Sequence, residues 1–387
     1  MNAQEPQKVQ PLPAVFVHSP GLDAYPYPPD CPFSSARAGK TRAILSSMGL
    51  LGGADRQEAA PQPAGREDLE AFHAGRYLDV LRAATGGHLD VEGLAMGIGT
   101  QDTPVFAGLY EYASLACGAT LTAAALILNG QARAAFNPSG GYHHAGPARA
   151  AGFCYLNDVV LGCLRLTGAG KRVVFLDLDA HHGDGVQRAF YDRSDVMTIS
   201  LHESGHTLFP GTGFEEEIGV GDGTGYSVNL PMPSEVHDEA LLRAFEKVAV
   251  PLIGVCDPDV IVMELGMDGL AGDPLTHMAL TNNAYADAIE QVRAFGRPIL
   301  AVGGGGYHIP NTVRGWALCW TVLCGANSHA DDMTPGMGGV LLETTEWYGG
   351  LRDRRLAPPA ETRAAADQAV DGTIEKVQAS VFPLHGL

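Results

Sequence analysis

Several signals of other protein classes are missing from this sequence. The first twelve residues are polar and contain proline, without the basic start and apolar stretch of a signal peptide. We find no apolar run of the ~18 residues that a membrane-spanning helix needs. The GxSxG motif of serine hydrolases and the GxxxxGK(S/T) phosphate loop are absent, and no internal repeat is visible. We therefore expect a soluble, cytoplasmic protein with a disordered N-terminus at residues 1–12 and a single domain at residues 13–387.

Paired cysteines and an excess of positive charge are also missing. The seven cysteines form no CxxC pair, and most lie among apolar residues, which is typical of buried free thiols in a reducing compartment. Lysine and arginine number 25 against 44 acidic residues, a net charge of −19. Such a chain repels nucleic acids and anionic membranes, so we expect neither as a partner. The charge suits cationic substrates such as lysine-rich tails or polyamines, although acidic surfaces also simply keep proteins soluble. The sequence leaves the oligomeric state open.

Short β-branched runs that end at Gly, Asp or His indicate buried strands. We predict strands over Val173–Asp179, Met197–Leu201, Val260–Leu265 and Pro298–Val302. Between and after them lie helix-length stretches, including Glu239–Val250, Asn283–Phe295 and a tail helix over Glu361–Val381. This alternation predicts an α/β fold with a single open, mostly parallel β-sheet and helices on both faces. Ligands bind such sheets beyond the carboxyl ends of the strands, where the polar residues of this chain gather. Residues 332–362 are rich in Gly and Pro and predict a surface appendage.

The densest group of polar residues is DLDAHHGDG at residues 177–185. Because side chains alternate along a strand, Asp179 and His181 can point the same way and share a cation. Oxygen and nitrogen donors without thiolate suit zinc or ferrous iron in an open, catalytic site. The alternative is a turn in which Asp and Gly only serve local geometry. Four carboxylates or imidazoles within a few positions disfavour that alternative.

A third metal ligand is needed, because catalytic zinc takes about three protein ligands and a water. Asp268 follows the predicted strand VIVMEL, where a lone Asp is by default a helix N-cap. Because residues 177–185 offer only two ligands, Asp268 becomes a stronger candidate for the third. Asp273 in the same loop is the rival, and because Pro274 follows it, a turn or cap is the simpler interpretation.

Two Gly-rich segments carry further candidates. His143 and His144 follow Gly140-Gly141, and on an irregular segment both can reach one pocket and divide acid and base roles. Four glycines precede Tyr307 and allow close backbone approach, with its phenol as a donor to whatever enters. Taken alone, each pattern fits a structural role as well. Weaker candidates are Phe153 and Phe209, which could wall an apolar slot but could equally be core residues. Asp102 could accept a substrate N–H or simply form an Asx-turn.

The segments GGYHHA, GFCYLND, DLDAHHGDG, SLH, FPGTG, LGMDGLAGD and GGGGY, in this order, resemble the histone deacetylase family of the arginase/deacetylase fold. The match runs from about Pro20 to Gly325. GFCYLND and AGDPL are more similar to class I enzymes and acetoin-utilisation-type bacterial homologues than to class II. The resemblance implies a zinc-dependent amidohydrolase whose substrate is an acylated lysine of a protein or peptide, or a small acylated amine.

The same resemblance implies the roles of individual residues. Zinc, or ferrous iron in its place, would bind to Asp179, His181 and Asp268. Acid–base and transition-state roles would fall to His143, His144, Asp177, Asp184 and Tyr307. Asp102 would anchor the substrate backbone at the rim of a tunnel lined by Gly152, Phe153, Phe209, Leu275 and Gly305. Structural potassium would occupy an inner site at Asp177, Asp179, His181, Ser200 and Leu201, and an outer site at Phe190, Arg193, Val196 and Tyr226.

The chain departs from the family pattern at Met267 and at residues 146–149 (GPAR), which leaves the preferred acyl group and substrate shape open. Three alternatives to a lysine deacylase remain. An acetylpolyamine amidohydrolase would place acidic residues at the gate, where this chain has Leu275. An arginase-like ureohydrolase would need a two-metal cluster. A binding protein would use the metal pocket without turnover.

Overall fold

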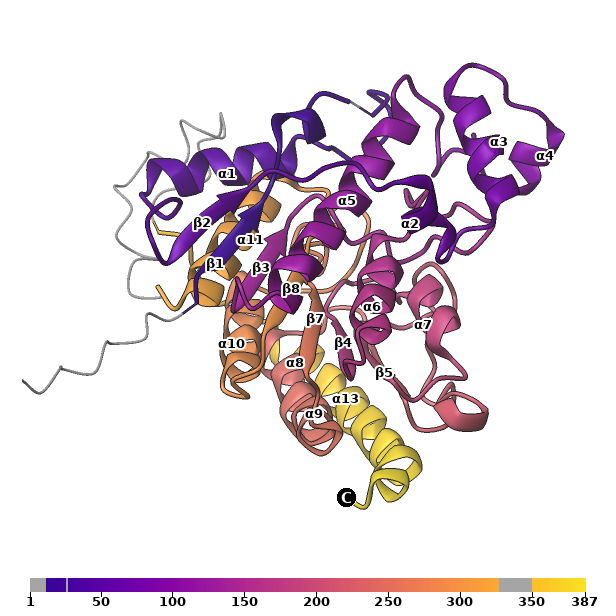
Figure 1. Cartoon of the computed structure of the whole chain (residues 1–387). Coiled ribbons are helices and arrows are strands. Elements are labelled where there is room, and N and C mark those ends of the chain that lie inside the picture. The colour runs from indigo at the N-terminus through magenta and orange to yellow at the C-terminus, as the bar shows by residue number, and fades with distance from the viewer. Residues whose placement is uncertain (1–11, 26, 327–349) are drawn as a thin grey trace, which may run out of the picture.

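The computed structural model describes residues 12–25, 27–326 and 350–387. The N-terminus that we expect to be disordered lies outside the described residues except for Leu12, and so does the surface appendage up to residue 349. The described residues contain one eight-stranded sheet of order β2-β1-β3-β8-β7-β4-β5-β6, in which all neighbouring strands are parallel (Figure 1). The sheet confirms the predicted fold class and is more uniformly parallel than expected.

The strands are short and mostly buried along their whole length. They are β1 Ala14–Val17, β2 Arg56–Ala59, β3 Ala134–Asn137, β4 Val173–Asp177, β5 Val196–Glu203, β6 Ser227–Met232, β7 Val260–Glu264 and β8 Ile299–Val302. The helices are α1 Arg37–Ser47, α2 Arg66–Glu70, α3 Gly75–Thr85, α4 Val91–Ala95, α5 Leu109–Leu128, α6 Asp158–Gly168, α7 Asp184–Phe190, α8 Asp238–Ala244, α9 Val250–Cys256, α10 Asn282–Arg293, α11 Ile309–Cys324 and α13 Ala360–Val381.

Most strands contribute to two hydrophobic cores, because successive side chains point to opposite faces of the sheet. In β4, Val174 and Leu176 belong to one core, and Val173 and Phe175 belong to the other. The first core is covered by α1, α8, α9, α10, α11 and α13, and the second by α5, α6 and α7 (Figure 1). Burial on both faces explains why these strands are apolar runs without a polar alternation.

The middle of the sheet contains a point where the chain direction switches. Strands β4 and β7 are neighbours, but the chain leaves β4 for β5 on one side and leaves β7 for β8 on the other. The two connections also run on opposite faces, since α7 and α10 belong to different cores. A crevice forms where such connections diverge, and ligands of open α/β sheets bind there. The fold thus places a binding site beyond Asp177 and Glu264, the last residues of β4 and β7.

The predicted strands and helices exist, with boundaries that differ by a few residues. The stretch predicted as one helix over Glu239–Val250 is longer, because α8 continues through a π turn at Phe245–Ala249 into α9. The tail helix is α13, which begins one residue earlier than predicted. Strands β1, β2, β3 and β6 had no counterpart among the sequence predictions.

One helix differs from the expectation that no apolar segment reaches membrane length. Among the described residues, α5 alone is long and apolar enough to cross a bilayer by length and composition, with a mean hydropathy of 1.4. In the structure, 61% of the apolar 18-residue stretch of this helix is buried, and α5 packs against α6, β3 and β8. Core helices of globular proteins meet the same criterion, and the burial of α5 accounts for its composition.

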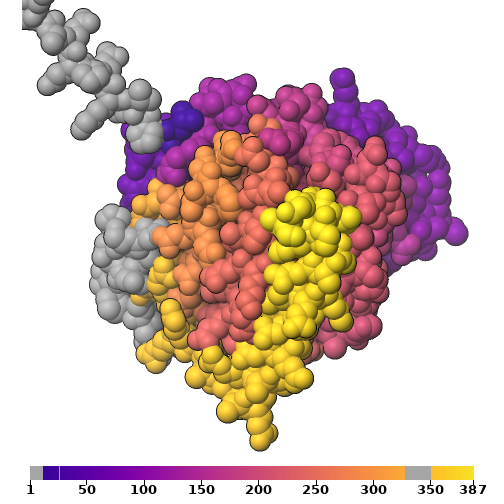
Figure 2. Space-filling view, turned by 90° about the horizontal axis from the view of Figure 1, so that it is seen from below, coloured from indigo at the N-terminus to yellow at the C-terminus, as the bar shows by residue number. Residues whose placement is uncertain are grey.

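The C-terminal helix packs on the sheet rather than standing apart from it. Figure 2 shows α13 in yellow lying across the segments that carry α8 and α9. Its residues Val370, Ile374 and Val377 belong to the first core, and Arg243 of α8 pairs with Asp367 at 2.8 Å. We therefore propose that residues 13–387 form one domain.

Shortening Ile374 to valine tests whether α13 belongs to that domain. Ile374 is 3% exposed, so Ile374→Val is expected to lower the free energy of unfolding by ~1 kcal/mol, in a single denaturant transition. Urea unfolding followed by circular dichroism measures this value. The exposed neighbour Glu375 is the control, since Glu375→Gln should change stability by less than ~0.5 kcal/mol. A separate early transition in the wild type would show instead that α13 unfolds on its own.

Candidate metal-dependent active site

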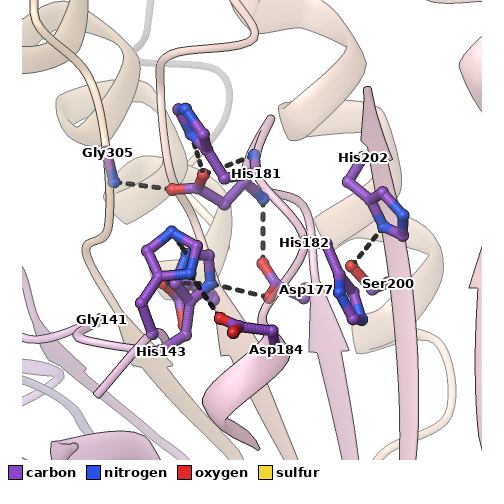
Figure 3. Close-up of polar contacts among 12 residues, drawn as sticks. Gly141, His143, Asp177, His181, His182, Asp184, Ser200, His202 and Gly305 are labelled. Atoms are coloured by element: carbon purple, nitrogen blue, oxygen red, sulfur yellow. Dashed lines mark hydrogen bonds and ion pairs between the residues drawn. The ribbon is translucent and has the colours of Figure 1, made fainter. Parts of the chain in front are cut away.

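Two carboxylates and one imidazole converge at the ends of β4 and β7. Asp179 and His181 follow β4, and Asp268 follows β7. The Nδ1 atom of His181 lies 2.8 Å from Asp268 Oδ2 and 3.2 Å from Asp179 Oδ1. The Gly305 N–H donates to Asp179 Oδ2 at 2.7 Å, and the Ala180 N–H donates to Asp268 Oδ1 at 2.9 Å. Backbone donors thus fix the two carboxylates around His181, as Figure 3 shows for Gly305.

The chemistry of this trio fits a divalent cation. One donor atom from each residue lies within 4.8 Å of the others, and all three residues are buried. Burial, together with the nearby charge of Asp179, raises the pKa of Asp268 to about 7. Burial lowers the pKa of His181, but the facing carboxylates Asp268 and Asp179 outweigh it and raise that pKa to about 10. Without a metal, protons on His181 and Asp268 offset the buried negative charge. A divalent cation can replace these protons, and an N/O donor set of this kind suits zinc or ferrous iron.

The tandem histidines lie beside the trio, each supported by its own carboxylate. His143 Nδ1 lies 2.9 Å from Asp177 Oδ2, and His144 Nδ1 lies 2.8 Å from Asp184 Oδ1. The Nε2 atoms of the two rings are 3.0 Å apart. Both histidines therefore turn their Nδ1 atoms toward carboxylates and their Nε2 atoms toward each other.

The loop before these histidines needs glycine for steric reasons. Gly141 has φ 93°, and a Cβ atom there would lie 2.4 Å from the backbone nitrogen of Gly304. The two Gly-rich segments that the sequence singled out thus touch each other. Their contact brings the tandem histidines and Tyr307 to the same place.

The two imidazoles have opposite shifts in proton affinity. Burial lowers the pKa of His143, but Asp177 outweighs it, by charge and by hydrogen bond, and raises that pKa to about 9. Burial and the neighbouring charge of His143 lower the pKa of His144 to about 4. At neutral pH the pair therefore holds one cationic and one neutral imidazole, an arrangement suited to divided acid and base roles.

A small pocket lies beside these groups. Its lining includes Gly152, Phe153, both tandem histidines, Asp179, His181, Gly305 and Tyr307. The Tyr307 ring lies 5.6 Å from the Phe153 ring, and the Phe209 ring lies 5.0 Å from the His144 ring. Burial and the charges of Asp268 and Asp179 hold the pKa of the Tyr307 phenol well above its usual value, so that it stays protonated as a donor. A larger open hollow between α2, α5 and α6 has neither histidine nor cysteine in its lining.

The remaining rim candidates lie near the pocket mouth. Asp102 accepts a hydrogen bond from the Gly152 N–H at 2.9 Å, and its backbone carbonyl accepts one from the Phe153 N–H at 2.9 Å. Leu275 is half-buried in the loop after Asp268, where its N–H donates to Asp273 Oδ1 at 2.9 Å. The pocket lining proper does not include Leu275.

The inner group of expected potassium ligands sits at the end of β4 and beside it within β5. Asp177 pairs in register with Ser200, which Leu201 follows on the same strand. Asp177 Oδ1 accepts a hydrogen bond from the Asp179 N–H at 3.0 Å, and the Ser200 hydroxyl lies 2.7 Å from His202 Nδ1 (Figure 3). These residues are neighbours, but the Ser200 hydroxyl already has a protein partner.

The outer group of expected potassium ligands lies around the start of β5. Phe190 ends α7, Val196 begins β5, and the Tyr226 carbonyl accepts a hydrogen bond from the backbone two residues further along β5, at 2.8 Å. The Arg193 guanidinium stacks over Phe190 and forms an ion pair with Asp195 at 2.6 Å. None of these residues belongs to the pocket lining.

Sequence reasoning missed or misjudged several polar groups around the pocket. Asp268 begins no helix, so its default interpretation as an N-cap is wrong. Asp273 does serve a turn, but its Oδ2 also accepts the Tyr307 N–H at 2.7 Å.

Arg37 is buried and donates to the Gly306 carbonyl at 2.8 Å. Glu264, the last residue of β7, is fully buried beside His143. A charged residue at the end of an apolar strand was the only available signal for Glu264.

Comparisons with known proteins agree with this geometry. Residues 31–323 match the histone deacetylase domain. The chain is 40% identical over 320 residues to the acetoin utilization protein AcuC of Bacillus subtilis, covering 81% of this chain and 82% of that protein. It is 41% identical over 289 residues to histone deacetylase 8 of Xenopus tropicalis, covering 74% of this chain and 76% of the relative.

A solved structure extends the similarity to the whole fold. The crystal structure of a histone deacetylase homolog from Aquifex aeolicus superposes with a TM-score of 0.82 at 32% identity, covering 95% of this chain and 100% of that one. The resemblance found in the sequence motifs is thereby confirmed, together with the arginase/deacetylase fold. The chain belongs to the histone deacetylase family of metal-dependent amidohydrolases.

Proposed function

We propose that this protein hydrolyses the amide bond of N-acyl-lysine in proteins or peptides. The observation that carries the proposal is that Asp179, His181, the tandem histidines and Tyr307 line one small pocket, with Asp268 completing the trio beside it. A slot of this kind, walled by Phe153 with glycines around it, suits a long, thin acyl-lysine side chain. The net charge of −19 also favours approach of cationic substrates.

The trio would hold zinc, or ferrous iron in its place. A cation bound there supplies Lewis-acid chemistry, because it polarises the scissile carbonyl and lowers the pKa of the attacking water toward ~7. His144, which is neutral at pH 7, takes the proton of that water as general base. The Tyr307 phenol donates a hydrogen bond to the oxyanion that develops on the carbonyl. The proton on His144 or His143 then passes to the leaving amine, while Asp184 and Asp177 orient the two rings.

Other parts of the site have supporting roles in this proposal. Gly152, Phe153 and Gly305, which belong to the pocket lining, would surround the acyl-lysine chain, and Phe209 and Leu275, which lie outside that lining, would extend the tunnel. Potassium would bind as a structural ion at the inner group around Asp177 and at the outer group around Tyr226. All seven cysteines are free thiols, which supports a cytoplasmic site of action.

Hydrolysis of labelled peptides tests the proposed reaction. The full chain, stripped by a chelator and reloaded with zinc or ferrous iron, should hydrolyse acetyl-lysine peptides only after reloading. Acetylputrescine is the comparison substrate, and a higher kcat/KM for it would identify the enzyme as an acetylpolyamine amidohydrolase. No chelator-sensitive hydrolysis of either substrate would indicate a binding protein. A panel of acyl chains from acetyl to long acyl, with lactyl, then defines the acyl preference.

Removing the Asp102 carboxylate is expected to separate the two substrate classes. Asp102 stands at the rim, and we propose that it accepts backbone N–H groups of a peptide substrate. Asp102→Ala should lower kcat/KM for peptides by about 10-fold, the loss of one hydrogen bond to a charged group, and leave acetylputrescine turnover nearly unchanged. Asp30, an exposed acidic residue that like Asp102 lies close enough to Cys31 to raise its pKa, is the control, and Asp30→Ala should affect neither substrate. Equal losses on both substrates would show that Asp102 acts only by holding the Gly152 loop.

A further inference from the structure

A buried glutamate that the proposed reaction does not use lies where β5 ends. Glu203 is the last residue of this strand, and its side chain is 0% exposed. Its backbone N–H donates to the Ala180 carbonyl at 2.8 Å, so the end of β5 is joined to the segment that carries Asp179 and His181. A buried carboxylate is costly unless the protein supplies hydrogen-bond donors to it. The donors that Glu203 receives therefore show what it holds.

Four donors from three separate segments converge on this carboxylate. The Thr207 and Ser234 hydroxyls donate to Glu203 Oε1 at 3.0 Å and 3.1 Å. The His277 N–H donates to Oε2 at 2.9 Å, and His277 Nδ1 lies 2.9 Å from Oε1. Burial alone would raise the pKa of Glu203, but the hydrogen bonds from His277 and Thr207 outweigh burial and lower that pKa. One ionised carboxylate thus ties three loops to the end of β5.

The first of these loops leads to Phe209. The turn before it is closed by the Thr207 N–H, which donates to the Ser204 carbonyl at 2.9 Å. Phe209 follows two residues later, and its ring lies 5.0 Å from the His144 ring. Because the Thr207 hydroxyl is bound to Glu203, the position of the Phe209 ring depends on that carboxylate.

The second loop carries Leu275 and is held at both ends. At one end, Asp273 accepts the Leu275 N–H at 2.9 Å and the Tyr307 N–H at 2.7 Å. At the other end, His277 is bound to Glu203 through its N–H and its imidazole. Leu275 is half-buried midway between these two anchors. Its distance from the Phe209 loop is therefore set by the carboxylate that both loops share.

We propose that Glu203 is a positioning residue that fixes the outer part of the substrate tunnel by holding the Phe209 and Leu275 loops at a set separation. This inference rests on the proposed deacylase function. Contacts with the four-carbon stem of the acyl-lysine are the same in the ground state and in the transition state, so their loss raises KM and leaves kcat unchanged. The Glu203 carboxylate has no hydrogen bond to the metal trio or to the tandem histidines.

Glu203→Gln tests the proposal with the zinc-loaded full chain. The amide keeps the shape of the side chain, but it has a single acceptor oxygen, and its NH2 group would face N–H and O–H donors. At least one loop should therefore be released. We expect KM for an acetyl-lysine peptide to rise about 10-fold, the effect of lost contact with about two methylene groups, with kcat and zinc content within a few-fold of the wild type. A merely structural role would lower zinc content and kcat instead.

A double-mutant cycle shows whether Glu203 acts through the two loops. The double variant Phe209→Ala/Leu275→Ala should itself raise KM, because it removes both side chains that the loops present. Adding Glu203→Gln to this double variant should change KM by less than about 2-fold. A full 10-fold effect in that background would overturn the proposal, since Glu203 would then act on the substrate by another route.

Asp238 is the matched control, because this half-buried carboxylate also anchors a loop, accepting the Thr281 N–H at 2.7 Å, but lies outside the pocket lining. Asp238→Asn should leave KM and kcat within about 2-fold of the wild type. If Glu203→Gln does not fold, Thr207→Val and His277→Ala each remove one donor, and each should raise KM about 3-fold.

The outcomes separate this proposal from the deacylase function itself. Normal hydrolysis by the wild type with an unchanged KM in Glu203→Gln, or in both single-donor variants, would overturn the positioning role alone. No hydrolysis of acyl-lysine peptides by the zinc-loaded wild type would overturn both proposals together.

Discussion

Asp268→Asn is expected to lower kcat/KM for acyl-lysine hydrolysis by at least ~10³-fold. Loss of a catalytic metal removes several kcal/mol of transition-state stabilisation, and each factor of ten corresponds to about 1.4 kcal/mol. Asparagine keeps the shape of the side chain and can still accept the Ala180 N–H through Oδ1. What it loses is the anionic Oδ2 that faces His181 Nδ1 at 2.8 Å. The change should therefore weaken metal binding without unfolding the chain.

Metal content and thermal unfolding, measured beside turnover, separate this explanation from simple misfolding. Asp268→Asn should melt close to the wild type in the absence of metal and should be stabilised less than the wild type by added zinc. Excess zinc should restore part of the turnover if the variant binds metal more weakly but in the same place. Full activity at normal metal content would show that the metal lies elsewhere, and the trio would then be excluded as its site.

The sequence was sufficient for the central strands of the fold. VVFLD and VIVME are apolar because β4 and β7 are buried on both faces, and each ends at a residue that carries charge. The outer strands carry a weaker pattern, since β2 is the polar edge strand RQEA and β6 contains proline within SVNLPM. The order of the strands depends on contacts far apart in the chain. The crevice between β4 and β7 therefore could not be located from local patterns.

The site divides in the same way between local and long-range information. Asp179 and His181 lie two residues apart, so that strand alternation predicted a shared cation. The strand β4 itself ends at Asp177, and the two residues come together in the bend that follows it. Asp268 is distant in sequence, and local rules favour a helix cap that the structure does not contain. Only the family resemblance predicted Asp268 as the third ligand, which stays a prediction. Neither local sequence patterns nor the family resemblance identified Glu264, because its burial and its approach to His143 arise only when β7 packs between β4 and β8.

Tyr307→Phe is expected to lower kcat by ~10²–10³-fold, the effect of removing one donor from an oxyanion site, while KM changes little. The Tyr307 N–H is held by Asp273 Oδ2 at 2.7 Å, and the ring packs near Phe153. Phenylalanine keeps these contacts and removes only the O–H. The substrate should therefore still enter the pocket and bind, but the developing negative charge loses its protein donor.

Tyr285 is a closely matched control for this change. Its phenol is also buried near Asp268 and Asp179, its O–H has no hydrogen-bond partner in the described structure, and it lies outside the pocket lining. Tyr285→Phe should leave kcat within a few-fold of the wild type, so that a large loss confined to Tyr307→Phe must come from the pocket O–H itself. Metal content should be the same in both variants. An unchanged kcat in Tyr307→Phe would remove this phenol from the reaction and leave oxyanion stabilisation to the cation alone.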